Sequence, residues 1–93
     1  MSPDFHAHAK QRLISNAYPG WWVRTYRWSS SEEDWLKVTA VRNFEPKTPG
    51  GRRVTQLVCV VDEETREGAE VTDFSNELIL CCTKAEAKKA GVV

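Results

Sequence analysis

Aromatic and arginine side chains concentrate in residues 20–28, Gly-Trp-Trp-Val-Arg-Thr-Tyr-Arg-Trp, which hold three of the four tryptophans. Aromatic rings beside a guanidinium can hold a peptide, a methylated ammonium group or an unstacked base. Successive side chains of a β-strand point to opposite faces, so alternate residues of this segment share one face. A further tryptophan joins that face across the next hairpin. The resulting candidate partner-binding face consists of Trp22, Arg24, Tyr26, Trp28 and Trp35.

The opposite face of the same segment is also apolar, because it carries Trp21 and Val23. A chain of this size has one core, and that core explains only one of the two faces. The other face needs a cover from elsewhere in the chain, for which the N-terminal segment is the obvious candidate, or a partner. If an exposed aromatic face is self-complementary, the partner is a second copy.

Basic residues interleave with these aromatics, which is typical of a groove that follows a phosphate backbone and stacks bases. Thirteen Lys and Arg balance thirteen Asp and Glu, however, so the total charge does not attract nucleic acid. Segment 29–34 beside the same strands is also acidic. Binding of single-stranded nucleic acid, or of an RNA or DNA backbone, is therefore the second hypothesis. Its candidate residues are Arg24, Arg27, Arg42, Lys47, Arg52 and Arg53.

Metal and catalytic chemistry find little support in the spacing of residues. His6 and His8 lie two apart, and the three cysteines form no Cys-x-x-Cys pair. Cys59, Cys81 and Cys82 lie in apolar runs, which favours reduced core thiols over reactive thiolates. There is no glycine-rich phosphate loop and no nucleophile elbow. We therefore expect a non-enzymatic protein without metal, cofactor or small-molecule substrate.

Composition and length indicate one globular domain at 1–93. With 41% hydrophobic and 28% charged residues, the chain is neither disordered nor of low complexity. Its longest apolar runs, at 57–61 and 78–82, are too short to span a bilayer and fit buried strands. The N-terminus lacks the apolar core of a signal peptide. We expect a cytoplasmic protein.

Local patterns predict a helix, five strands and a second helix. Phe5, Ala9, Leu13 and Ala17 recur at four-residue spacing after Ser-Pro-Asp, which predicts a helix at about 3–17. Alternation and turn residues predict strands at about 21–28, 35–44, 52–61, 69–74 and 77–83. Within 35–44, strict alternation places Leu36, Val38 and Ala40 on the inner face and Trp35 and Val41 on the outer face. A Thr-x-x-Glu capping box then predicts a short helix at about 84–90.

Short links between successive strands favour antiparallel neighbours. We therefore predict a mainly β (α+β) fold, in which five strands form a strongly bent antiparallel sheet or a small SH3-like or OB-like barrel. An open five-stranded meander with the N-terminal helix across one face is the alternative. Whether the sheet closes is left open.

The function expected from these features is a non-enzymatic protein-interaction module, an adaptor or an inhibitor. It would bind a protein partner, or itself as a homodimer, through the aromatic and arginine face. A compact chain without targeting or catalytic residues would suit a protein encoded by a phage or mobile element. The alternative is a small β-barrel that binds single-stranded nucleic acid.

Overall fold

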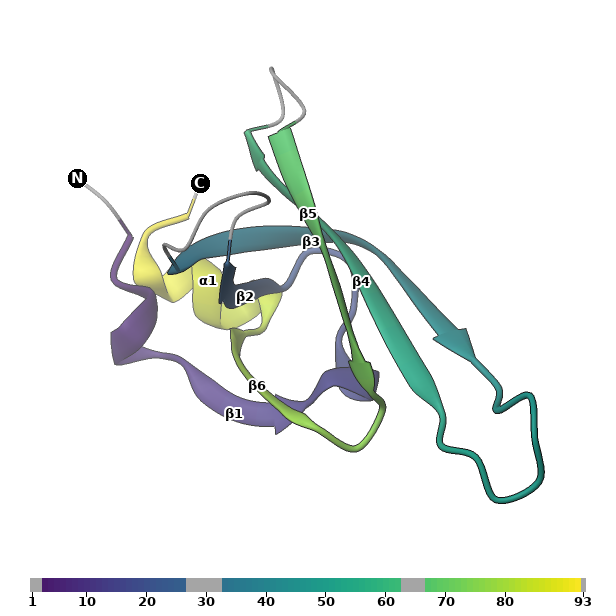
Figure 1. Ribbon diagram of the computed structural model, residues 1–93. Coiled ribbons are helices and arrows are strands. Elements are labelled where there is room, and N and C mark those ends of the chain that lie inside the picture. Colours follow the sequence, from purple (N-terminus) through teal and green to yellow (C-terminus); the bar gives the residue numbers. More distant parts are fainter. Residues whose placement is uncertain (1–2, 27–32, 63–66, 93) are drawn as a thin grey trace.

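The computed structural model describes residues 3–26, 33–62 and 67–92. Its architecture is mainly β and consists of one antiparallel sheet with a short C-terminal helix (Figure 1). The elements follow the order η1 (Phe5–Ala7), β1 (Lys10–Leu13), η2 (Ile14–Asn16), β2 (Trp22–Tyr26), β3 (Glu33–Phe44), β4 (Val54–Asp62), β5 (Glu67–Phe74), β6 (Leu78–Cys82) and α1 (Lys84–Ala90), where η denotes a 3-10 turn. Among the described helices, none is both long and apolar enough to cross a membrane.

The six strands of the sheet follow the order β1-β6-β2-β3-β4-β5, and every neighbouring pair is antiparallel. β1 and β5 lie at its two edges, so the sheet does not close into a barrel. The predicted antiparallel β architecture is confirmed, with six strands in place of five. The five predicted strand ranges overlap β2 to β6, and the sixth strand comes from the N-terminal segment.

The predicted helix at 3–17 is not formed. The segment instead makes η1, strand β1 and η2, and β1 pairs with β6 in the register Lys10 to Cys81 and Leu13 to Leu78. An apolar residue at every fourth position is a local signal for a helix. Pairing with β6 is a long-range interaction, and it gives hydrogen-bond partners to backbone groups of β6 that would otherwise be unpaired. The long-range pairing overrides the local pattern.

A bulge in β3 reverses part of the predicted alternation. Val38 pairs with Cys59 and Ala40 pairs with Val58, so Thr39 is one residue in excess on β3. An extra residue moves every later side chain of the strand to the other face. The assignment of Ala40 to the inner face and Val41 to the outer face is therefore wrong, and Val41 packs against the core.

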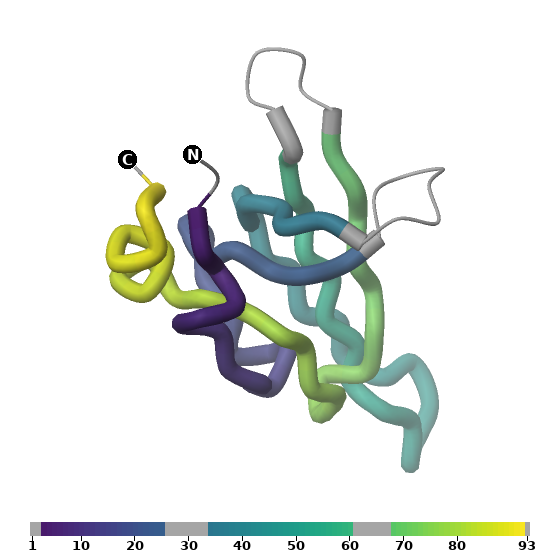
Figure 2. Tube along the Cα trace, turned by 90° about the vertical axis from the view of Figure 1, so that its left-hand side faces the viewer, coloured from purple at the N-terminus to yellow at the C-terminus, as the bar shows by residue number. Residues whose placement is uncertain are grey.

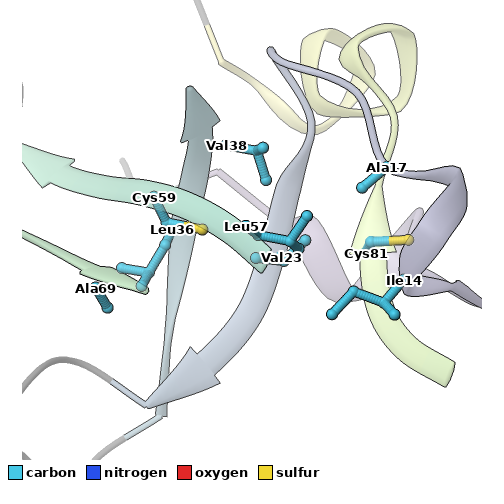
Figure 3. Close-up of a cluster of buried hydrophobic side chains, with 9 residues drawn as sticks. All are labelled: Ile14, Ala17, Val23, Leu36, Val38, Leu57, Cys59, Ala69 and Cys81. Atoms are coloured by element: carbon cyan, nitrogen blue, oxygen red, sulfur yellow. The ribbon is translucent and has the colours of Figure 1, made fainter. Parts of the chain in front are cut away.

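The inner face of the sheet holds the main core, which we call the inner cluster (Figure 3). Its side chains come from residues 14–17 and from all strands except β1, so the core ties the two halves of the sheet together. Burial of this apolar surface is the dominant stabilising term. The members are Ile14, Ala17, Val23, Leu36, Val38, Leu57, Cys59, Ala69 and Cys81.

The two ends of the chain lie side by side, far from the 44–54 turn (Figure 2). A backbone hydrogen bond of 2.9 Å joins Asp4 N to Ala90 O. The predicted capping box of α1 is confirmed, because Thr83 Oγ1 accepts from Glu86 N while Glu86 Oε1 accepts from Thr83 N. Gly91 ends the helix with a φ of 116°, a conformation that favours glycine.

An ion pair fastens α1 to the sheet edge and should make stability depend on pH. Arg12 Nη2 lies 2.9 Å from Glu86 Oε2, and this hydrogen bond lowers the pKa of the Glu86 carboxyl below its ordinary value. A depressed folded-state pKa adds stability above the unfolded-state pKa, and that stability is lost as pH falls through the folded-state value. Glu86→Gln keeps the capping geometry and should lower the free energy of unfolding by about 0.5–1 kcal/mol at pH 7.

Urea denaturation at pH 7, 5 and 3 measures this prediction. The stability difference between wild type and Glu86→Gln should shrink as pH falls through the folded-state pKa of Glu86, because the protonated carboxyl is neutral like the glutamine amide. Asp4→Asn, whose side chain makes no capping hydrogen bond, is the control for general acid effects. A difference that persists unchanged at pH 3 would contradict the ion-pair explanation.

Candidate interaction surface

Two rings of the predicted aromatic face, the buried Trp35 and the partly buried Trp22, pack against Phe5. Phe5 lies between them, with ring centroids 5.1 Å from Trp22 and 4.9 Å from Trp35. Trp35 is only 8% exposed and belongs with Phe5, Cys82 and Ala87 to a second buried cluster, which we call the outer cluster. It lies on the outer face of the sheet, beneath η1 and α1. The chain itself therefore supplies a cover for these two rings.

The other members of the predicted face follow β2 away from the outer cluster. Arg24 is half-buried and pairs across the ladder with Trp35. Tyr26 ends β2, and its backbone pairs with Glu33. Trp28 lies outside the described residues. That this face binds a partner stays a prediction.

The basic residues of the second hypothesis do not form one surface among the described residues. Arg24 is on β2, whereas Arg42 lies seven residues beyond Trp35 on β3, about 23 Å at the usual rise of a strand. Lys47, Arg52 and Arg53 are exposed between β3 and β4, and Arg27 is outside the described residues.

Two of these arginines contact acidic or polar side chains within the chain. Arg53 Nη2 lies 2.9 Å from Glu45 Oε1, and Arg52 Nη2 donates to Asn76 Oδ1 at 2.6 Å. Both side chains are at least half exposed, and exposed ion pairs contribute little, so these contacts leave both arginines accessible to solvent. Nucleic-acid binding stays a prediction.

The three cysteines are buried free thiols. Burial raises the pKa of Cys59 to about 12 and that of Cys82 to about 11. Burial also raises the pKa of Cys81, against the opposing effect of Arg12, whose Nη1 lies 3.7 Å from the sulfur. The thiols are therefore protonated at neutral pH, which leaves them weakly nucleophilic. No cluster of three metal-ligating side chains occurs in the described parts of the chain.

An exposed apolar row crosses the outer face of β3, β4 and β5 at the end nearest the 44–54 turn. Phe44 pairs with Val54, and Val54 pairs with Phe74, so the three side chains point to the same face. Phe44 is 49% exposed and Phe74 is 40% exposed. We call these three residues the apolar row.

Two further rows continue this face towards the bulge. In the register of the ladders, the second row is Arg42, Gln56 and Thr72, and the third is Ala40, Val58 and Glu70. All six are at least partly exposed, and Gln56 Nε2 donates to Glu70 Oε2 at 3.1 Å. The apolar row and these two rows together are the outer patch. It shares the outer face of the sheet with the outer cluster, but η1 and α1 do not cover it.

Hydrogen bonds on the inner face connect the strands that carry the apolar row. Thr55 is fully buried on the inner face, and its hydroxyl makes 2.8 Å hydrogen bonds with Asn43 Oδ1 and Ser75 Oγ. These bonds join β3, β4 and the turn after β5. The Arg52 guanidinium lies over the Phe74 ring, 3.9 Å from its centre. These contacts fix the positions of the three strands that carry the apolar row.

A second aromatic feature is a groove beside residues 15–19, with a volume of about 700 Å³. Trp21 and Tyr18 line it with ring centroids 6.2 Å apart, and Tyr18 is 68% exposed. The Arg12 guanidinium lies 5.6 Å from the Trp21 ring, but it is also engaged by Glu86. The Arg12 guanidinium in this groove is therefore less available to a ligand, because Glu86 already pairs with it.

Sequence reasoning missed both the apolar row and this groove. Phe44 and Phe74 lie at strand ends beside polar turns, which is a weak signal that each is exposed. Their alignment with Val54 depends on two ladder registers and on the bulge, and strand alternation does not specify these. No protein-family model, curated protein or solved structure matches the chain.

Proposed function

We propose that this chain is a non-enzymatic protein-interaction module that binds a protein through the outer patch. The observation that carries the proposal is the alignment of two exposed phenylalanines with a valine across three paired strands. Single exposed apolar residues are ordinary on protein surfaces, whereas contiguous apolar groups typically mark interaction sites. The outer patch replaces the aromatic face of β2 as the proposed contact surface.

The composition of the outer patch favours a protein over other ligands. Its apolar row is bordered by Gln, Thr, one glutamate and two arginines, Arg42 and Arg52, which resembles the apolar centre and polar rim of protein interfaces. Arg42 and Glu70 lie on the same face, so the patch is not a single-sign surface for phosphates.

Site-specific photo-cross-linking in the cells that make the protein tests this proposal. A photo-reactive phenylalanine analogue at Gln56, in the middle of the outer patch, should give a discrete adduct after irradiation. Phe44→Ser in the same chain should reduce that adduct at least tenfold, because a few large side chains carry most of the binding energy of an interface.

The matched control places the same analogue at Gln11, which is exposed on the opposite edge strand. Its adducts should be unaffected by Phe44→Ser. If Gln56 gives no adduct, or an adduct that Phe44→Ser leaves unchanged, the outer patch is not the interaction surface. The mass of the adduct identifies whether the captured chain is this protein or another.

A further inference from the structure

We infer that the partner of the outer patch is a second copy of this chain, packed face to face about a two-fold axis that runs along β4. This inference rests on the proposed function, since it names the partner of the same surface. It follows from how the nine residues of the patch are distributed over three strands. β4 is the central strand of the patch, with β3 on one side and β5 on the other.

The two-fold axis is parallel to β4 and lies midway between the two facing sheets. Rotation by 180° about it exchanges the positions of the two flanking strands. β3 of one copy then lies over β5 of the other, while β4 lies over β4. Phe44 of each copy meets Phe74 of the other, and Val54 meets Val54. The two apolar rows thus face each other, as in the aligned packing of two sheets about 10 Å apart.

The charges of the outer patch fit the same rotation. Arg42 lies on β3 and Glu70 on β5, one row apart, which corresponds to about 7 Å along the strands. The rotation therefore brings Arg42 of one copy beside Glu70 of the other, twice in each dimer. No ion pair to Arg42 occurs within the described part of the chain, so its charge is available for this contact.

The other two-fold axis in the plane of the sheet, perpendicular to the strands, fits poorly. When centred on the middle row, it would place Arg42 over Arg42 and Phe74 over Glu70. Like charges in contact are strongly unfavourable, and an apolar ring would desolvate a carboxylate. Charge complementarity therefore selects the axis along β4.

Packing about β4 also avoids the elements that already cover the outer face. η1 and α1 lie over β2 and β6, on the β3 side of the patch. The rotation carries η1 and α1 of the second copy past the β5 edge of the first copy. In the described chain, β5 is the last strand of the sheet there, so the two covers do not meet.

The size of the contact indicates a weak dimer. Three strands about 4.8 Å apart and three rows about 7 Å apart give a contact smaller than the roughly 800 Å² per partner of a standard interface. Buried area does not set affinity by itself, but a contact this small is expected to be weak. The test therefore has to reach high protein concentrations.

Sedimentation equilibrium of the purified full chain, from about 5 to 500 μM, tests the inference. Wild type should dimerise, and Phe44→Ser should raise the dissociation constant at least tenfold. Tyr18→Ser, which removes an exposed ring away from the patch, should leave the constant unchanged. Circular dichroism verifies that each variant is folded.

Charge reversal tests the axis independently of the rings. Arg42→Glu and Glu70→Arg should each weaken the dimer about tenfold, and the double variant should restore it to within about threefold of wild type. Both side chains are exposed, so these variants are expected to fold. A dimer that the double reversal fails to restore would overturn the proposed axis.

The outcomes distinguish this inference from the proposed function. If wild type stays monomeric at about 500 μM while Gln56 cross-links to a different protein, the second copy is excluded and the interaction surface stands. If wild type is monomeric and Gln56 gives no adduct, both fail. A dimer insensitive to Phe44→Ser would place the self-contact elsewhere on the molecule.

Discussion

Phe5→Ala is expected to lower the free energy of unfolding by about 3–5 kcal/mol, the usual effect of removing a buried aromatic ring. Phe5 is 7% exposed and lies against both Trp22 and Trp35. Removing its ring would leave a cavity and expose two indoles to water. The effect is large for a residue so close to the N-terminus, because η1 is part of the cover of the sheet.

Urea denaturation followed by tryptophan fluorescence and by circular dichroism measures this change. Phe5→Leu refills part of the space and should lower the free energy of unfolding by only about 1–2 kcal/mol relative to wild type. Phe44→Ala is the matched control, because that ring is half exposed and its truncation should change stability by about 0.5 kcal/mol. If Phe5→Ala lowers stability by less than about 1 kcal/mol, η1 does not seal the outer cluster.

The parts of the fold that were predictable from the sequence depend on local chemistry. Thr83 and Glu86 form a capping box from four consecutive residues, and the structure has the helix that they indicate. Alternation and turn residues likewise indicate where strands lie. These signals need no information about which distant segment will become a neighbour.

The features that the sequence did not specify depend on pairing between distant segments. Residues 10–13 become a strand because β6 is available to pair with them, although their apolar spacing also fits a helix. Thr39 becomes a bulge because of the register between β3 and β4, and nothing in its neighbours distinguishes it from an ordinary strand residue. Cover of Trp35, and partial cover of Trp22, was one of two open possibilities, and it required the position of Phe5.

The candidate site shows the same limit. Counting aromatic residues drew attention to residues 20–28, where three tryptophans cluster. In the structure, Phe44, Val54 and Phe74 from three strands form an exposed apolar row, and none of them is conspicuous alone. This candidate surface is assembled only by the ladder registers, which the sequence does not specify.

Gly68→Ala is expected to lower the free energy of unfolding by about 3 kcal/mol, at the upper end of the usual effect of overpacking. Gly68 pairs with Val60, next to an irregularity in the β4–β5 ladder between Val60 and Asp62. A Cβ at this position would collide with the carbonyl oxygen of Cys59. That oxygen belongs to the backbone of β4, which is paired on both sides, so it cannot rotate away as a side chain would.

Relief of this collision requires β5 to move relative to β4, and this gives the substitution a second consequence. Glu70 and Phe74 reach the outer patch only through the register of β5, so a displaced β5 should also weaken the self-association. Glu70→Ala, on the same strand but with an exposed side chain, should change the free energy of unfolding by less than about 0.5 kcal/mol and is the control in urea denaturation. Equal stabilities of Gly68→Ala and wild type would show that the β4–β5 ladder accommodates a side chain at this position, in contradiction to the close approach of the two backbones.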